Sequence, residues 1–285
     1  MKRRHLLTLA PAVLAAGANS TFGKAIDPAT QTTAGFTISI QCWSFKNFTL
    51  FEAIEKAAAA GAQGVEIFEG QSLSPEQKNI KVGVNMPAES ITALLEHAKK
   101  HNIAVVNFGV VDIPNNEVEA RKFFEFGKAL GLYGITTESL GALDLLEKLS
   151  QEYDLKVCFH NHPKPSPLWN PDTVFNALKG RHANIGYCAD LGHWPSSGLN
   201  PLDVIKKIAP LVRSFHFKDR ASLTSPTHDQ VLGTGLLDLT AILDEVRKHG
   251  FKGNVSIEYE HNWQDSVADI AQGVGFLRGY SKSRA

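Results

Sequence analysis

Residues 156–190 read KVCFHNHPKPSPLWNPDTVFNALKGRHANIGYCAD and contain one unit of a pattern that recurs along the chain. A β-rich run at 156–159 ends in polar residues, a helical pattern follows at 172–178, and a second β-rich run begins at Ile185. A strand followed by a helix and another strand is typical of a parallel sheet with crossover helices. This stretch therefore predicts an α/β fold.

The same alternation of strand and helix fills the chain from Phe36 onward. The β-rich runs lie at 36–42, 64–68, 104–110, 134–137, 156–159, 185–189, 212–217 and 254–257. The helical patterns lie at 50–60, 90–100, 117–130, 142–149, 172–178, 202–208, 238–248 and 268–277. Ser90 is the expected cap of the second helix, and glycines 61, 131, 180 and 250 stand at expected helix ends.

Eight strand–helix units in about 250 residues predict a single (β/α)8 barrel over residues 36–280. A doubly wound open sheet is the alternative. No predicted strand leads into the G-x-G-x-x-G turn that such sheets use to bind dinucleotides, which favours the barrel.

Composition narrows the class of protein. The 285 residues are 43% hydrophobic and 20% charged, which is ordinary for a globular enzyme. Lys plus Arg and Asp plus Glu both number 29, so no basic excess indicates a nucleic-acid partner. The cysteines are Cys42, Cys158 and Cys188, and we expect buried free thiols, since three are too few for a disulfide framework.

Residues 1–25 resemble an export signal. Lys2, Arg3 and Arg4 precede an apolar run at 6–18, which is shorter than the ~20 residues of a membrane-spanning helix. The Arg3-Arg4 pair resembles a twin-arginine signal. We therefore expect an exported, periplasmic protein without stable membrane insertion. The protein would be cytoplasmic if this segment is not a signal.

Polar residues gather at the ends of four predicted strands. Alternate side chains of a strand point to the same face. Each polar side chain therefore shares a face with a small residue beneath it, and we expect these polar side chains to point into the barrel. The four pairings are His160 with Cys158, Asp190 with Cys188, His216 and Lys218 with Ser214, and Glu258 with Ser256.

Two histidines, an aspartate and a glutamate at one barrel mouth suit a divalent metal with nitrogen and oxygen ligands. We expect His160, Asp190, His216 and Glu258 to bind one Mn²⁺, Co²⁺ or Zn²⁺ ion. A metal-free pocket that binds a sugar is the alternative.

Three motifs resemble the xylose-isomerase-like barrel superfamily. They are Asp190-x-x-His193, His216-x-Lys218-Asp219 and the strand-end Glu258. The superfamily includes sugar phosphate isomerases and epimerases, inosose dehydratase and apurinic endonucleases. The resemblance covers about residues 36–280 and implies that Asp190, His216 and Glu258 are metal ligands and that Glu66 lies near the substrate.

The chain departs from the family pattern after the fifth strand. Many members have Glu-Asn-His there, where this chain has His160-Asn161-His162. In isomerases of the family that glutamate is also one of two acid–base groups. Some dehydratase members have a similar His-x-His, so the substitution moves the expectation toward a lyase.

The resemblance implies that the enzyme abstracts a proton next to the carbonyl of a sugar or keto-sugar. Glu258 is the expected base, and the second proton carrier is expected to be His160, with His162 as the alternative. Lys218 is expected to hold a substrate oxygen, with a salt bridge to Asp219 as the alternative. We predict a metal-dependent isomerase or epimerase. The alternatives are a lyase that performs β-elimination on a keto-sugar or keto-glycoside, and a non-catalytic sugar-binding barrel.

The expected partner is a small-molecule carbohydrate, because tryptophans follow several predicted strand ends and aromatic rings stack on sugars. A nuclease is disfavoured because its site usually needs more metal ligands and a basic face for DNA. The residues expected to contact the substrate are Glu66, His162, His193, Trp194 and Trp43.

Overall fold

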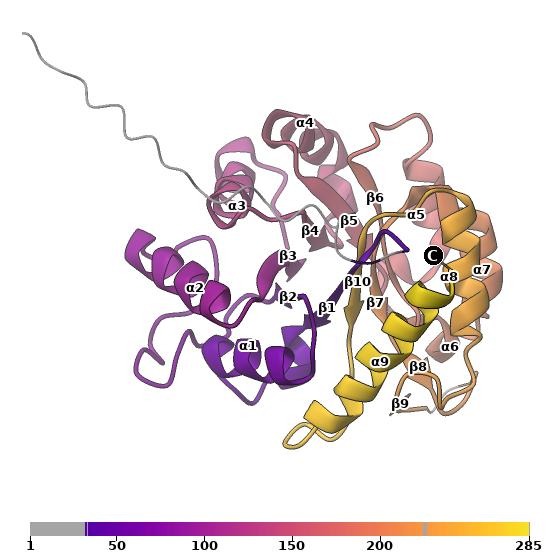
Figure 1. The fold of residues 1–285 in the computed structure, drawn as a ribbon. Helices are drawn as coiled ribbons and strands as arrows, with labels where there is room; N and C mark the ends of the chain where they lie inside the picture. Colours follow the sequence, from indigo (N-terminus) through magenta and orange to yellow (C-terminus); the bar gives the residue numbers. More distant parts are fainter. Residues whose placement is uncertain (1–31, 33, 225–226, 285) are drawn as a thin grey trace, which may run out of the picture.

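The computed structural model describes residues 32, 34–224 and 227–284, so the predicted signal at 1–25 lies outside the described residues. Eight parallel strands close into a barrel in the order β1-β10-β7-β6-β5-β4-β3-β2. The helices surround this barrel (Figure 1). The predicted (β/α)8 barrel is confirmed.

The barrel strands begin and end close to the predicted residues. They are β1 (Thr37–Gln41), β2 (Gly64–Ile67), β3 (Ala104–Val111), β4 (Gly134–Thr137), β5 (Lys156–His160), β6 (Ile185–Asp190), β7 (Val212–Phe217) and β10 (Asn254–Ile257). A small antiparallel ribbon, β8 (Asp219–Arg220) with β9 (Asp229–Gln230), follows β7.

The helices also follow the predicted pattern, except that α6 was not predicted. They are α1 (Leu50–Ala59), α2 (Ala88–Lys100), α3 (Glu117–Leu130), α4 (Leu143–Tyr153), α5 (Pro171–Ala177), α6 (His193–Ser196), α7 (Pro201–Ile208), α8 (Leu239–Lys248) and α9 (Val267–Ser283). The predicted helix-end glycines at 61, 131, 180 and 250 all have positive φ angles, between 66° and 83°.

Side chains at the helix starts explain several of these boundaries. Thr49 and Glu52 form a reciprocal capping box at α1, and asparagines at 116, 170 and 200 cap α3, α5 and α7. The prediction that Ser90 caps α2 is wrong. The helix begins at Ala88, and the cap position is held by Pro87, whose side chain makes no capping hydrogen bond.

The barrel strands carry apolar side chains outward and polar or small ones inward. Val157 and Phe159 of β5 belong to the hydrophobic core between the strands and the helices, whereas Cys158 between them does not, although it is equally buried. Neighbouring strands align their inward residues, with Cys188 beside Ser214 and Asp190 beside His216. Inward-pointing polar residues therefore meet at the carboxyl ends of the strands.

The cysteines and the helix lengths were also compared with the sequence-based expectations. Cys42, Cys158 and Cys188 are free and buried, as predicted. Among the described residues, no helix is long and apolar enough to cross a membrane.

Candidate active site

A cavity of about 360 Å³ opens at the carboxyl ends of the barrel strands. Cavities of this size are typical of small-molecule sites. Three lining residues are strand-end histidines or carboxylates that the sequence predicted to converge. The full lining is Gln41, Trp43, Phe68, Glu69, Gly109, Val110, His160, His162, His193, His216, Glu258 and Glu260.

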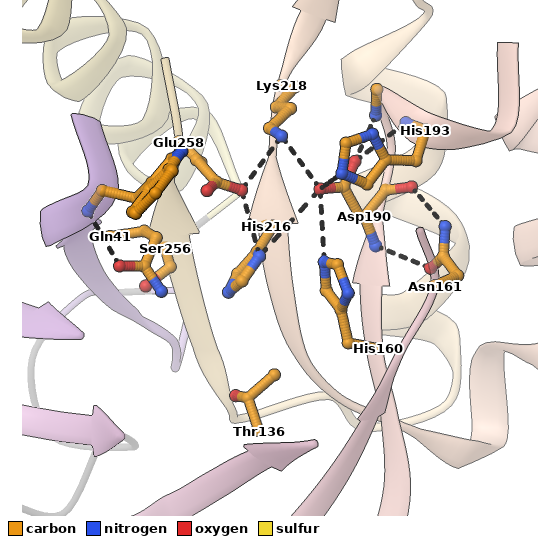
Figure 2. A network of polar contacts seen from close by, with 12 residues as sticks. Gln41, Thr136, His160, Asn161, Asp190, His193, His216, Lys218, Ser256 and Glu258 are labelled. Carbon is orange, nitrogen blue, oxygen red and sulfur yellow. Dashed lines mark hydrogen bonds and ion pairs between the residues drawn. The ribbon is translucent and has the colours of Figure 1, made fainter. Parts of the chain in front are cut away.

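One oxygen of Asp190 is the centre of the polar network beside this cavity. Its Oδ2 atom lies 3.5 Å from Nε2 of His160, 3.4 Å from Nε2 of His193 and 3.1 Å from Nζ of Lys218 (Figure 2). The other oxygen accepts hydrogen bonds from the backbone N–H groups of Gly192 and His193, at 2.8 and 2.9 Å. Asp190 is therefore fixed through Oδ1 and directs Oδ2 at the cluster.

The charge of Asp190 is maintained by its neighbours. Burial raises the pKa of this carboxyl, but His193, Lys218 and His160 outweigh burial and hold the pKa well below its ordinary value. Asp190 is consequently an anion at neutral pH and is available as a ligand for a cation.

Carboxylates lie behind the two central histidines. Nδ1 of His160 lies 3.0 Å from Oε1 of Glu138, which leaves Nε2 facing Asp190. Nε2 of His216 lies 3.2 Å from Oε1 of Glu66, and Nδ1 lies 3.0 Å from Oε2 of Glu258. A carboxylate behind an imidazole fixes the orientation of the ring and increases its basicity as a ligand.

Glu66 is itself held within the barrel. It is fully buried beneath the cavity, where it accepts hydrogen bonds from the hydroxyl groups of Thr136 at 2.7 Å and Ser256 at 2.9 Å. It does not line the cavity. Glu66 therefore supports His216 from below.

The residues around Asp190 fit a divalent metal. The candidate ligand atoms of His160, Asp190 and His216 lie within 4.8 Å of one another, and all three residues are buried. Within the described part of the chain, Nε2 of His160, Oδ2 of Asp190 and both ring nitrogens of His216 make no well-aligned hydrogen bond and are held by ion-pair contacts of 3.0–4.0 Å. Buried polar atoms without well-aligned hydrogen bonds are costly, and a cation bound between them would satisfy them. Glu258, next to His216, would complete a set of two nitrogen and two oxygen ligands.

Lys218 lies against the same carboxylates. Its ammonium group is fully buried and contacts Asp190 and, at 3.0 Å, Oε2 of Glu258 (Figure 2). It also lies 2.5 Å from Oε1 of Glu260. Burial lowers the pKa of Lys218, but the carboxylates prevail and hold this pKa well above its ordinary value. Gly192 gives the lysine room, because a Cβ atom at this glycine would lie 2.6 Å from Cδ of Lys218.

The alternative of a salt bridge between Lys218 and Asp219 does not describe the structure. The carboxylate of Asp219 instead accepts hydrogen bonds from backbone N–H groups. The donors belong to Arg220, Gly233, Gly235 and Leu237, at 2.9–3.1 Å. Asp219 thus organises the loop between β9 and α8, and Lys218 instead contacts Asp190, Glu258 and Glu260.

The carboxylates beside the cavity outnumber the lysine. Lys218 is the lysine in this cluster. The carboxylates that contact Lys218, His160 or His216 are Glu66, Glu138, Asp190, Glu258 and Glu260. This excess of negative charge favours a bound divalent cation.

Two residues that hold the site in place were missed by the sequence analysis. Glu138 directly follows β4 and accepts from Nδ1 of His162 at 2.7 Å, besides its contact with His160. Asn161 pairs with the backbone of Asp190 through hydrogen bonds of 3.0 and 3.1 Å. Both carried a signal, since Glu138 is the first acid after a predicted strand and Asn161 stands between two predicted site histidines.

The other residues expected to contact substrate differ in their placement. His162 and His193 line the cavity, and so does Trp43, of which 38% is exposed. Trp194 is fully buried in the hydrophobic core and is not among the described residues that line the cavity. Trp194 therefore packs beneath the site rather than facing a ligand.

Comparison with known proteins agrees with this geometry. The family model for the xylose isomerase-like TIM barrel matches residues 138–280. An inosose dehydratase from Clostridium botulinum is 23% identical over 276 residues, which cover 84% of this chain and 91% of the relative.

Solved structures share the whole barrel. An uncharacterised protein from Parabacteroides distasonis is 31% identical with a TM-score of 0.69, and the match covers 85% of this chain and 98% of that one. A xylose isomerase-like TIM barrel protein from Mycobacterium smegmatis, in complex with magnesium, is 13% identical with a TM-score of 0.69, and the match covers 89% and 99% of the two chains. The strand-end motifs, the closed barrel and these matches together show that the chain belongs to the xylose isomerase-like TIM barrel family.

Proposed function

We propose that the protein is a metal-dependent sugar enzyme that removes a proton from the carbon next to a carbonyl group, in the manner of an isomerase or epimerase. The observation that carries the proposal is the cluster around Oδ2 of Asp190, where ligand atoms of His160 and His216 that make no well-aligned hydrogen bond meet beside an open cavity. Relatives of this chain include an enzyme that acts on inosose.

His160, Asp190, His216 and Glu258 would hold the metal. When bound, the ion would polarise the carbonyl of the sugar and so acidify the neighbouring carbon. Mn²⁺, Co²⁺ and Zn²⁺ suit the two imidazole and two carboxylate ligands. A related barrel has been solved with magnesium, which carboxylates and water bind well.

The chain supplies acid–base groups on two sides of the cavity. Glu258 projects from the end of β10 and lines the cavity, so it is the proposed base. His160 follows β5 on the other side, with its Nδ1 directed at Glu138. When Nε2 of His160 binds the metal, both of its ring nitrogens are engaged, so His162 would carry the proton, because it lines the cavity and its Nδ1 lies 2.7 Å from Oε1 of Glu138. Lys218 is fully buried and is not among the described residues that line the cavity, so it would stabilise developing negative charge from behind Asp190 and Glu258 rather than by contact with the substrate.

A lyase is the second candidate, and a specific asymmetry favours it. Glu258 and Glu260 lie on one side of the cavity, whereas His160, His162 and His193 form a group of touching rings on the other, with centroids 4.6–5.7 Å apart. A carboxylate base opposite an imidazole acid would suit removal of a proton and departure of a β-hydroxyl or glycosyl group. The inosose dehydratase relative is consistent with this outcome.

Turnover on a panel of sugars tests the proposal. Keto-hexoses and inosose would be incubated with purified protein and Mn²⁺, Co²⁺ or Zn²⁺, and the products identified by NMR. An isomerised or epimerised sugar, lost on chelation and in Asp190→Asn, supports the first candidate, and an unsaturated product supports the lyase. No conversion of any sugar with any metal would contradict both and leave a sugar-binding barrel.

We also propose that the protein is exported, on the charge and apolar pattern of residues 1–25. A fusion of residues 1–30 to a reporter should be exported, and Arg3-Arg4→Lys-Lys should block this on the twin-arginine route. A reporter that stays in the cytoplasm with the native segment would contradict the proposal.

A further inference from the structure

A second cavity adjoins the candidate active site and shares a wall with it. Its volume is about 730 Å³, and it lies between the loop after β1 and the loop after β2. Trp43 and Phe68 line both cavities, and their rings meet edge to face with centroids 5.1 Å apart. A ligand held in the first cavity can therefore extend past Trp43 into the second.

The shared wall offers an aromatic surface to a ligand. Trp43 is one of the few large hydrophobic residues in the described part of the chain that is exposed, at 38%. Nζ of Lys46 lies 4.8 Å from the ring centroid of Trp43 and 3.5 Å from that of Trp263, and these contacts limit the movement of the indole. An exposed indole held in this way suits the apolar face of a sugar ring.

Gln71 supplies a buried acceptor to the second cavity. Its side chain is only 3% exposed yet lines the cavity, and its Nε2 atom donates to the carbonyl oxygen of Phe48 at 3.1 Å. This hydrogen bond fixes the orientation of the amide. In the described part of the chain, Oε1 of Gln71 has no hydrogen-bond partner. Because this oxygen is itself buried, a ligand hydroxyl would satisfy it where the ligand displaces the side chains that cover it.

The remaining polar groups of the second cavity are mainly donors. Lys46, Lys78 and Lys81 line it, and Glu52 is the carboxylate among the described lining residues. Glu52 is already engaged, because it accepts from the backbone N–H and the hydroxyl of Thr49 at 2.8 and 2.6 Å. The cavity thus combines an aromatic face, an unpaired acceptor and ammonium donors, which together match a polyhydroxylated ring.

We propose that the second cavity is a sugar-binding subsite, so that the substrate is a glycoside or disaccharide rather than a free monosaccharide. One sugar ring would reach the strand-end cluster. The next ring would stack on Trp43 and donate a hydrogen bond from a hydroxyl group to Oε1 of Gln71. The inference rests on the proposed function, because it assumes that the first cavity binds a sugar unit.

Calorimetric titration of the metal-loaded protein tests the subsite. The probes are glucose, galactose and mannose, each compared with its β-1,4 disaccharide: cellobiose, β-1,4-galactobiose and mannobiose. At least one disaccharide should bind about tenfold more tightly than its monosaccharide, which is what one aromatic stack and one hydrogen bond contribute together. Equal affinity across every pair, or no binding of any disaccharide, would overturn the proposal.

A pair of matched variants locates the effect. Asn47 is exposed and lines the second cavity, so Asn47→Trp should fill it and remove the disaccharide advantage while monosaccharide affinity is unchanged. Asn79 is exposed on the neighbouring loop and lines a different cavity, so Asn79→Trp should keep the advantage. An advantage that survives in a folded Asn47→Trp protein would place the second unit elsewhere.

Saturation-transfer NMR on the unaltered protein gives a readout that needs no variant. Both rings of the bound disaccharide should receive saturation, whereas saturation of one ring alone would contradict the subsite. The two proposals fail separately. If no sugar is converted but disaccharides still bind more tightly than monosaccharides, the proposed enzymatic function is refuted and the subsite stands. If sugars are converted but disaccharides bind no more tightly, the subsite is refuted and the enzymatic function stands.

Discussion

Glu138 is the residue on which the orientation of two histidines depends. It contacts Nδ1 of both His160 and His162 and also accepts from the hydroxyl of Ser166 at 2.8 Å. Burial raises the pKa of Glu138, but the hydrogen bonds from these histidines prevail and lower this pKa. An anionic Glu138 directs the Nε2 atom of His160 toward Asp190.

Glu138→Gln should weaken metal binding by about 10–100-fold, the usual effect of losing a carboxylate behind a ligand histidine. Calorimetric titration with Zn²⁺ or Mn²⁺ measures this. Glu147→Gln is the matched control, since Glu147 pairs with Arg181 and is not among the described residues lining the candidate cavity. Metal affinity equal to wild type in Glu138→Gln would show that His160 is not a ligand oriented by this carboxylate.

Lys218 contributes positive charge to the cluster of carboxylates, as a bound metal ion would. Lys218→Met leaves Asp190, Glu258 and Glu260 without their shared cation. Removing one partner of a buried ion pair costs about 3–5 kcal/mol, so the variant should be destabilised by this amount in metal-free buffer.

Added Mn²⁺ should raise the free energy of unfolding more in Lys218→Met than in wild type. The ion would neutralise the carboxylates that the lost lysine leaves uncompensated. Urea unfolding with and without metal measures both effects. A metal-free variant as stable as wild type would mean that the lysine does not neutralise this cluster.

At the scale of elements, the loop after β1 contributes lining residues to both cavities. This loop ends at Thr49, which caps α1 through the reciprocal bonds with Glu52. Thr49→Ala should lower the free energy of unfolding by about 0.5–2 kcal/mol, the usual value of a helix N-cap. Thr92→Ala, an exposed position within α2, is the control and should stay within about 0.5 kcal/mol of wild type. Equal effects of the two substitutions would contradict the capping role.

The fold could be predicted from sequence because each element carries a local signal. The β-rich run at 156–159 and the helical pattern at 117–130 gave β5 and α3 almost to the residue. The start of α2 was misplaced because Ser90 has a strong capping preference, whereas Pro87 occupies the cap position without a side-chain bond. Local preference fails where the backbone of a preceding proline already sets the turn.

The site could be predicted only in part. Strand alternation places His160, Asp190 and His216 on the inner face, since that depends on neighbours in sequence. The partners of those residues depend on strands and loops far apart in the chain. Glu138 meets His160 across 22 positions, and Lys218 meets Glu260 across 42. Such pairings follow from barrel closure and side-chain reach, which the periodicity of a single segment does not contain.

At the scale of the whole molecule, closure of the barrel brings together strand ends that lie far apart in the sequence. β5, β6, β7 and β10 are consecutive neighbours around the barrel, so His160, His216 and Glu258 line one cavity and Asp190 lies beside it. We propose that this cavity acidifies a carbon next to a sugar carbonyl and that Glu258 takes the proton.

Solvent-deuterium exchange at the α-carbon of a keto-sugar, followed by NMR with saturating metal, tests that claim most directly. Wild type should exchange the hydrogen, and Glu258→Gln should slow exchange by at least ~10²-fold with metal still bound, the low end for loss of a general base. Glu260→Gln, which alters the neighbouring carboxylate on the same side of the cavity, should slow exchange less. Undiminished exchange in metal-loaded Glu258→Gln would contradict the claim.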